Sequence, residues 1–203
     1  MTNLFSYTMK DDTGFAPHVD PTCRYLSLAC CKPRIRESAN DKDWVVGFGG
    51  KELSDKSGRN MVHRLVYAAR ISKVLDFDSY HSNPTLSGRV DNIYHSVDQK
   101  GKEWIQTSNP YHSKKNVMKD TKANRVLISD HFLYFGSSGP KLEEIGSQFS
   151  QLPKKGPNHK KLDLERDAVA KLFVDHLERS FAFNKCSSPT EEGRRKHCDD
   201  CDP

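Results

Sequence analysis

The first two-thirds of the chain alternate short apolar runs with polar turns. The stretches LFSYTM, RYLSLACC, DWVVGFGGK, EWIQ and RVLIS each have the length and composition of a strand. HRLVYAARISKVLDF has the strongest pattern, and its Val66, Ala68 and Ile71 are expected inside a sheet. The long polar connections, 79–104 and 107–124, are expected to be functional loops or disordered segments.

The pattern changes after residue 157. LDLERDAVAKLFVDHLERSFAF places Leu164, Ala168, Leu172 and Leu177 at helical spacing, which predicts an amphipathic helix of about five turns packed on the sheet. Several short strands followed by one late helix favour an α+β fold, with a strongly bent mixed sheet or a small barrel. A doubly wound sheet would need alternating helices, which the first 150 residues do not offer.

Length and charge set the broad class. The 203 residues suit one domain, which we assign to 1–183, and a polar cysteine-containing tail, 184–203, which we expect to be flexible. The net charge of +5 is compatible with a polyanionic partner but is not typical of an arginine-rich nucleic-acid arm. No targeting signal and no run of roughly 18 apolar residues is present, so we expect a cytoplasmic protein without membrane contact.

The six cysteines are then expected to be mostly thiols. Four residues near the end have part of the spacing of a zinc site: Cys186, His197, Cys198 and Cys201. A second C-x-x-C is absent, so we predict no metal and keep zinc at these residues as the alternative. A disordered acidic tail that exposes its thiols is the other interpretation.

Basic residues cluster in CCKPRIR. Lys32, Arg34 and Arg36 alternate, so they would project from one face of an extended chain and could hold successive phosphates. The other interpretation is a solvated strand edge, where charges deter aggregation.

Several loop residues could contact the ring of a ligand. Phe15, in the turn GFAP, could stack on it, or could fold back onto the core. Asn92 and Tyr94, in DNIYH, and His112 could read the polar edges of a base.

The stretch ISDHFLYFG sets a carboxylate beside an imidazole. Asp130 and His131 could act as general base and orienter. Adjacent strand residues point to opposite faces, so only one of the two would face a pocket unless the strand ends at Ser129. Tyr134, further along, is a second candidate for stacking.

Common nucleotide-binding and hydrolase motifs are missing. The chain has no P-loop, G-x-G-x-x-G, G-x-S-x-G or H-E-x-x-H. GFGGK is only superficially similar to a phosphate loop, because we expect no helix with Ser or Thr after its lysine.

The order of GFAP, LACCKPRIR, DWVVGFGGK, RLVYAARISKVLDFDSYH, DNIYH and RVLISDHFLYFG resembles the nucleotide modification associated domain, type two, from about Leu4 to about His159. This resemblance implies a context of DNA base modification and phage defence rather than a mechanism. DWVVGFGGK and ISKVLDFDSY are also similar to PUA-like domains of the ASCH and EVE types, which implies a small bent barrel with an aromatic pocket for RNA or a modified base.

We therefore expect the protein to bind a nucleotide, a modified base or nucleic acid. Three basic residues would meet phosphate, two aromatic residues would stack, and Asn92, Asp130 and His131 would read or polarise the ring. The alternative is an enzyme of nucleotide or DNA base modification that uses Asp130 and His131 as acid and base. A further alternative is an interaction subunit of a defence complex, with protein partners from a modification or defence operon. The sequence predicts no particular cofactor.

Overall fold

The computed structural model describes residues 1–98, 101, 103–154, 156 and 158–191. The strands are β1 (Asn3–Met9), β2 (His18–Val19), β3 (Leu26–Leu28), β4 (Trp44–Gly49), β5 (Leu65–Arg70), β6 (Lys73–Leu75), β7 (Tyr94–Ser96), β8 (Trp104–Gln106), β9 (Val126–Ser129), β10 (His131–Tyr134), β11 (His159–Asp163) and β12 (Lys185–Cys186). The α-helices are α1 (Pro33–Ser38), α2 (Lys51–Ser57), α3 (Phe77–Ser82), α4 (Val117–Asp120), α5 (Leu142–Ile145) and α6 (Ala168–Ser180). Short 3₁₀ turns are η1 (Lys114–Asn116), η2 (Gly136–Ser138) and η3 (Ser147–Gln151).

The strands form two main sheets and a hairpin. The larger sheet has the order β11-β1-β4-β5-β10-β12, the smaller one has the order β2-β3-β9-β6, and β7 pairs with β8. Strand β1 runs parallel to β4 and antiparallel to β11, so the larger sheet is mixed. The α+β class is confirmed. Neither main sheet closes on itself in the described part of the chain, so the small barrel is not confirmed.

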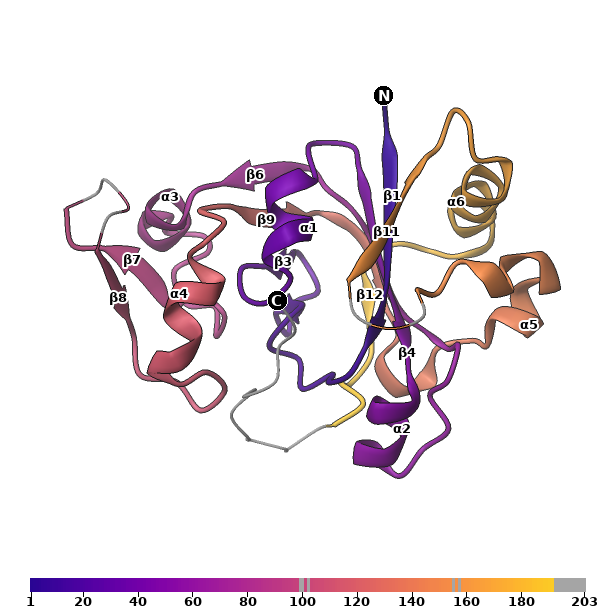
Figure 1. The fold of residues 1–203 in the computed structure, drawn as a ribbon, viewed down its shortest axis with the longest axis horizontal. Helices are drawn as coiled ribbons and strands as arrows, with labels where there is room; N and C mark the ends of the chain where they lie inside the picture. The colour runs from indigo at the N-terminus through magenta and orange to yellow at the C-terminus, as the bar shows by residue number, and fades with distance from the viewer. Residues whose placement is uncertain (99–100, 102, 155, 157, 192–203) are drawn as a thin grey trace.

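The larger sheet is covered on both faces (Figure 1). Side chains alternate along β1: Leu4 packs with α5, α6 and η3, whereas Phe5 and Tyr7 face α1 and the smaller sheet. A third cluster lies on the far side of the smaller sheet, where Cys30 and Ile128 pack against α3 and the β7–β8 hairpin. The molecule is therefore a stack of layers, and the central strands of the larger sheet, β1, β4, β5 and β10, are mostly buried between two of them.

Helix α6 is shorter than the pattern predicts. It has 13 residues and begins at Ala168, where the Asp167 carboxylate accepts hydrogen bonds from the N–H groups of Val169 and Ala170. The preceding residues form β11, which pairs with β1. The predicted five-turn helix is therefore not confirmed, because an N-cap at Asp167 and an unoccupied sheet edge outweigh the apolar spacing of the segment before it.

The polar stretches also contain more regular structure than expected. Helix α3 and the β7–β8 hairpin lie within or beside the first long connection, and η1 and α4 lie within the second. Helix α2 begins at the lysine of GFGGK and contains Ser54 and Ser57, so the expectation that no helix with Ser or Thr follows this lysine is wrong. It begins after Gly50 and ends at Gly58, whose φ of 68° suits glycine. In the described residues no helix is long and apolar enough to span a membrane.

Residues 184–191, which we call the strap, pack on the domain instead of leaving it. β12 pairs in parallel with β10, and Cys186 forms a disulfide with Cys23. The expectation of thiols is therefore wrong for these two cysteines, because the strap returns across the sheet to a residue 163 positions earlier. Cys30 and Cys31 are thiols. The rest of the predicted tail, 192–203, lies outside the described residues.

Two glycines with positive φ let the strap approach closely. A Cβ on Gly136 would lie 1.9 Å from the carbonyl oxygen of Ser188, and one on Gly14 would lie 2.7 Å from Cγ of Pro189. Both distances are too short for any other residue. The strap therefore packs directly against the backbone at Gly14 and Gly136.

The strap ends on a buried carboxyl group. Asp12 accepts hydrogen bonds from the Tyr134 hydroxyl at 2.5 Å and from the Thr190 N–H and hydroxyl at 2.8 and 2.6 Å. In return, the Asp12 N–H donates to Glu191 at 3.0 Å. Burial raises the pKa of Asp12, although the hydrogen bonds from Thr190 and Tyr134 oppose the shift.

This pKa predicts how stability depends on pH. Folded Asp12 keeps its proton at pH values where the unfolded carboxyl, with a pKa of about 3.9, has lost it. Its contribution is therefore complete below that value and declines as pH rises through the folded pKa. We expect the melting temperature of the wild type, relative to Asp12→Asn, to fall as the pH rises above about 4. A wild-type melting temperature that rises with pH relative to that of Asp12→Asn would contradict the raised pKa of Asp12.

Candidate functional site

Cys31 lies in the turn that joins β3 to α1. Its φ is 59° and that of Lys32 is 43°, both in the left-handed region that L-residues rarely adopt. Pro33 then starts the helix, where its missing N–H costs nothing. The prediction that this segment is an extended strand is therefore wrong, and the three basic side chains do not share a strand face. Backbone strain of this kind is common at functional sites.

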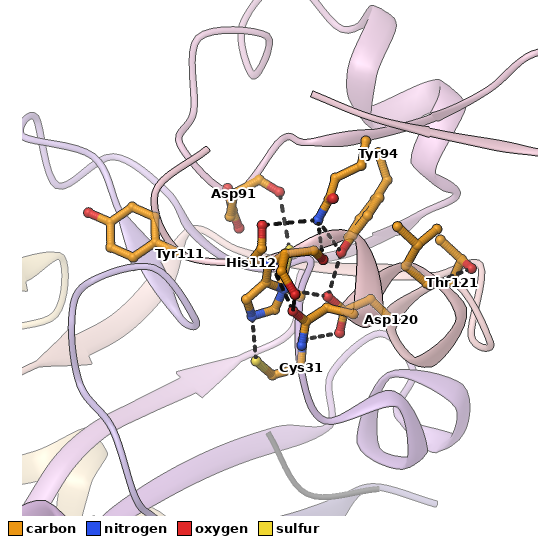
Figure 2. Close-up of polar contacts among 12 residues, drawn as sticks. Cys31, Asp91, Tyr94, Tyr111, His112, Asp120 and Thr121 are labelled. Atoms are coloured by element: carbon orange, nitrogen blue, oxygen red, sulfur yellow. Dashed lines mark hydrogen bonds and ion pairs between the residues drawn. The ribbon is translucent and has the colours of Figure 1, made fainter. Parts of the chain in front are cut away.

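Two further residues complete a chain of contacts from Cys31 (Figure 2). His112 Nε2 lies 3.5 Å from Cys31 Sγ, and His112 Nδ1 lies 2.7 Å from Asp120 Oδ2. All three residues are buried. Because an ionised carboxylate can only accept, Nδ1 carries the hydrogen and Nε2 presents its lone pair to the thiol. This is the order of nucleophile, base and orienting acid that cysteine-dependent enzymes use.

Asp120 holds this arrangement in place. Besides His112, it accepts hydrogen bonds from the Tyr94 hydroxyl at 2.9 Å and from the Cys31 N–H at 2.8 Å. Burial alone would raise its pKa, but the hydrogen bond from His112, the positive charge of Arg36 and the hydrogen bond from the Cys31 N–H hold the pKa of Asp120 below its usual value. Asp120 is therefore a carboxylate at neutral pH.

Arg36 is the buried counter-ion. Its guanidinium is fully buried and donates to four backbone carbonyls, those of Cys31, Asp120, Ala123 and Arg125. These carbonyls belong to α4, to the segment that follows it and to the turn before α1. Arg36 therefore joins the segments that carry Cys31 and Asp120, and it is not available to a phosphate.

The thiol of Cys31 is protonated at rest. Burial, with a further contribution from Asp120, raises its pKa well above the ordinary value. Attack by its sulfur thus needs a base, and His112 is in place for that. Burial also raises the pKa of the neighbouring Cys30, whose thiol contacts the carbonyl oxygen of Asp91 at 3.6 Å.

A metal could use part of the same cluster. Ligand atoms of Cys30, His112 and Asp120 all lie within 4.8 Å of one another. However, Asp120 already accepts three hydrogen bonds, and the buried cation Arg36 lies beside it. A divalent ion would have to displace these bonds and oppose this charge, so the residues fit a hydrogen-bonded triad better.

For the zinc alternative in the tail, Cys186 is already used in the disulfide. His197, Cys198 and Cys201 lie outside the described residues. The structure therefore removes one of the four predicted ligands.

A group of basic side chains lies at the exposed end of this region. We call Lys32, Arg34, His159 and Lys161 the cationic cluster. Burial lowers the pKa of His159, and repulsion from the three other members lowers it further. His159 pairs with Tyr7 and Lys161 pairs with Phe5 in the β1–β11 ladder, so both lie on the face of the sheet that α1 covers.

Lys32 connects the cationic cluster with the triad. Its ammonium lies 4.7 Å from the centre of the Tyr7 ring, and its charge also acts on Cys31. Tyr7 in turn has its hydroxyl 3.1 Å from that of Tyr67. Burial raises the pKa of both phenols, so they remain neutral hydrogen-bonding groups.

The structure does not bring Asp130 and His131 into this site. Asp130 is exposed in the turn between β9 and β10, where its N–H donates to Ser72. His131 lies on the opposite face of the larger sheet, stacked on Phe183 at 3.8 Å and 3.0 Å from a Glu178 oxygen on α6. Strand β9 ends at Ser129, so Asp130 lies in the turn and only His131 belongs to a strand.

Other predicted ligand-binding residues are used inside the fold. Phe15 is buried and stacks on Tyr111 at 4.6 Å, so it folds back onto the core. Asn92 donates to the carbonyls of Tyr80 and Leu86. Tyr94 and His112 both bind Asp120, and Tyr134 binds Asp12.

Sequence reasoning missed Cys31, Asp120, His159 and Lys161. The Cys-Lys-Pro sequence at the end of a strand was a usable signal, since proline favours a helix start and the preceding residues are then in a turn. Asp120 gives no such signal, because its eight-residue separation from His112 has no fixed geometry in an irregular segment.

A protein-family model matches most of the chain. The model for nucleotide modification associated domain 2 matches residues 1–195. The chain belongs to this family. The match covers the strap as well as both sheets, which confirms the resemblance seen in the sequence. No curated protein and no solved structure matches the chain. The association of the domain family with nucleotide modification agrees with the expected context, whereas the cytoplasmic location and the role in phage defence stay predictions.

Proposed function

We propose that this member of the nucleotide modification associated domain 2 family binds a nucleotide, with its phosphate on the cationic cluster and its base towards Cys31. The observation that carries the proposal is the convergence of Lys32, Arg34 and Lys161 on the half-buried His159. The positive charges of Lys32, Arg34 and Lys161 act together on His159, and a phosphate anion placed there would be attracted to all three. The family association supports a nucleotide as the source of the phosphate.

The position of the cationic cluster favours a nucleotide over a small inorganic anion. Lys32 is shared between the cluster and the surroundings of Cys31, so a phosphate on the cluster would lie next to the triad. Arg34 is exposed on α1 and donates to Asn158 at 2.6 Å, and Lys161 is exposed on β11. Both can reorient towards a ligand without disturbing the core.

Calorimetric titration tests this function. We expect deoxynucleoside 5′-monophosphates to bind and the matching nucleosides to bind more weakly, because the nucleosides lack the anion. Arg34→Ala and Lys161→Ala should each weaken monophosphate binding about tenfold, equivalent to about 1.4 kcal/mol. Raising the salt concentration should also weaken it.

Arg166→Ala is the matched control. Its side chain is 81% exposed beyond the end of β11 and pairs with Asp163, and replacing it with alanine changes the net charge by the same amount. Equal losses of monophosphate affinity in all three variants would show a general effect of net charge and would contradict the assigned site. Binding of a DNA oligonucleotide with no binding of monophosphates would identify nucleic acid as the ligand instead.

A further inference from the structure

Only one of the two adjacent thiols, Cys30 and Cys31, is placed for chemistry. Cys31 retains 7% of its surface exposed and has a base facing its sulfur, whereas Cys30 is completely buried against a carbonyl oxygen. The turn that presents Cys31 is held in an unusual conformation, and its N–H is bound by the same carboxylate that orients the base. A thiol that served only to fill space would need neither contact.

We propose that Cys31 is a catalytic nucleophile, activated by His112 and positioned by Asp120, that adds to C6 of a pyrimidine nucleotide. This inference rests on the proposed function, because the cationic cluster would hold the nucleotide beside the thiol. It goes beyond binding by assigning a covalent step.

The chemistry of a thiol selects the pyrimidine ring. Sulfur is a soft nucleophile that adds to conjugated carbon–carbon double bonds, and pyrimidines have such a bond between C5 and C6, in conjugation with C4. In purines the corresponding ring bond is shared with the fused imidazole ring, so addition would break the aromaticity of both rings. Attack by a cysteine on a nucleobase is therefore most favourable at C6 of a pyrimidine.

The step balances without an oxidant, a reductant or a second substrate. The Cys31 Sγ–H proton moves to His112 Nε2, and a bond forms between Sγ and C6. The electron pair of the C5–C6 double bond moves onto C5 and the atom attached to C4. C5 then takes a proton, gives up its original hydrogen, and the Sγ–C6 bond breaks to restore the double bond and the thiol. Asp120 stabilises the imidazolium that forms in between.

This cycle predicts exchange of the C5 hydrogen with solvent. In deuterated water, the wild type should introduce deuterium at C5 of dUMP or dCMP, measured by proton NMR and mass spectrometry, and should leave dAMP unchanged. Cys31→Ser should lower the exchange rate at least about a hundredfold, and His112→Gln by a similar factor. Cys30→Ser, which changes the neighbouring thiol, should exchange at a rate close to that of the wild type.

Two readouts separate this inference from the proposed function. Cys31→Ser should bind the monophosphate as the wild type does. In the wild type, Cys31 should react with iodoacetamide at least about tenfold faster than Cys30, with the alkylated cysteine identified by peptide mass spectrometry. Nucleotide binding without C5 exchange would overturn the addition step and leave the binding function intact. Alkylation of Cys31 no faster than that of Cys30 would overturn its role as nucleophile, whether or not nucleotides bind.

Discussion

Replacing Arg36 with methionine is expected to lower the free energy of unfolding by about 3–5 kcal/mol. The substitution leaves the carbonyls of Cys31, Asp120, Ala123 and Arg125 without their donor, and it takes the buried cation away from the Asp120 carboxylate. Methionine fills much of the volume but replaces none of these hydrogen bonds. Urea denaturation followed by circular dichroism measures the change.

Arg34→Met is the matched control on the same helix. Arg34 is exposed two residues earlier, so its stability should remain within about 0.5 kcal/mol of the wild type. The two substitutions are thus expected to have different effects. Replacing Arg36 affects stability, and replacing Arg34 affects nucleotide binding. Comparable stability of the two variants would contradict the structural role of Arg36.

Reduction of the disulfide is expected to have the second large effect. Cys23 and Cys186 are 163 residues apart, for which the chain-entropy relation gives about 5 kcal/mol, and losses of about 2–5 kcal/mol are typical when a native disulfide is removed. The strap should loosen first, because its pairing with β10 involves only two residues of each strand. Adding a thiol reductant should therefore lower the melting temperature of the wild type.

The double variant Cys23→Ser/Cys186→Ser supplies the control. It should melt at the lower temperature from the start, and the reductant should not change it further. A wild-type melting temperature that is the same with and without reductant would show that the disulfide does not contribute to stability.

Local patterns were sufficient for most strands. The apolar runs that contain β1, β4, β5 and β9 could be recognised because their side chains are buried in a sheet, where burial and β-branched residues leave a strong signal. The α+β class followed from their order. The start of α6 was placed too early, because apolar residues at helical spacing also occur in the segment before Ala168, part of which forms β11.

The candidate site depended on contacts that local patterns do not contain. Cys31, His112 and Asp120 come from a tight turn, an irregular segment and a short helix, and residues 31 and 112 are 81 positions apart. Arg36 looked like a phosphate ligand in the sequence, yet the turn at Cys31 and Lys32 directs it into the interior. Side-chain alternation predicted that only one of Asp130 and His131 would face a pocket unless the strand ended at Ser129. Strand β9 does end there, and the structure places Asp130 in an exposed turn and His131 against Phe183 and Glu178.

By itself, the sequence determined the family, the α+β class and the basic character of CCKPRIR, because these depend on composition, order and short-range periodicity. Only the tertiary structure decided which basic residues are exposed, that Cys23 meets Cys186, and that Cys31 faces His112. The physical reason is that hydrogen bonds and thiol contacts act over a few ångströms. Which groups come that close is fixed by how the two sheets and the strap pack together.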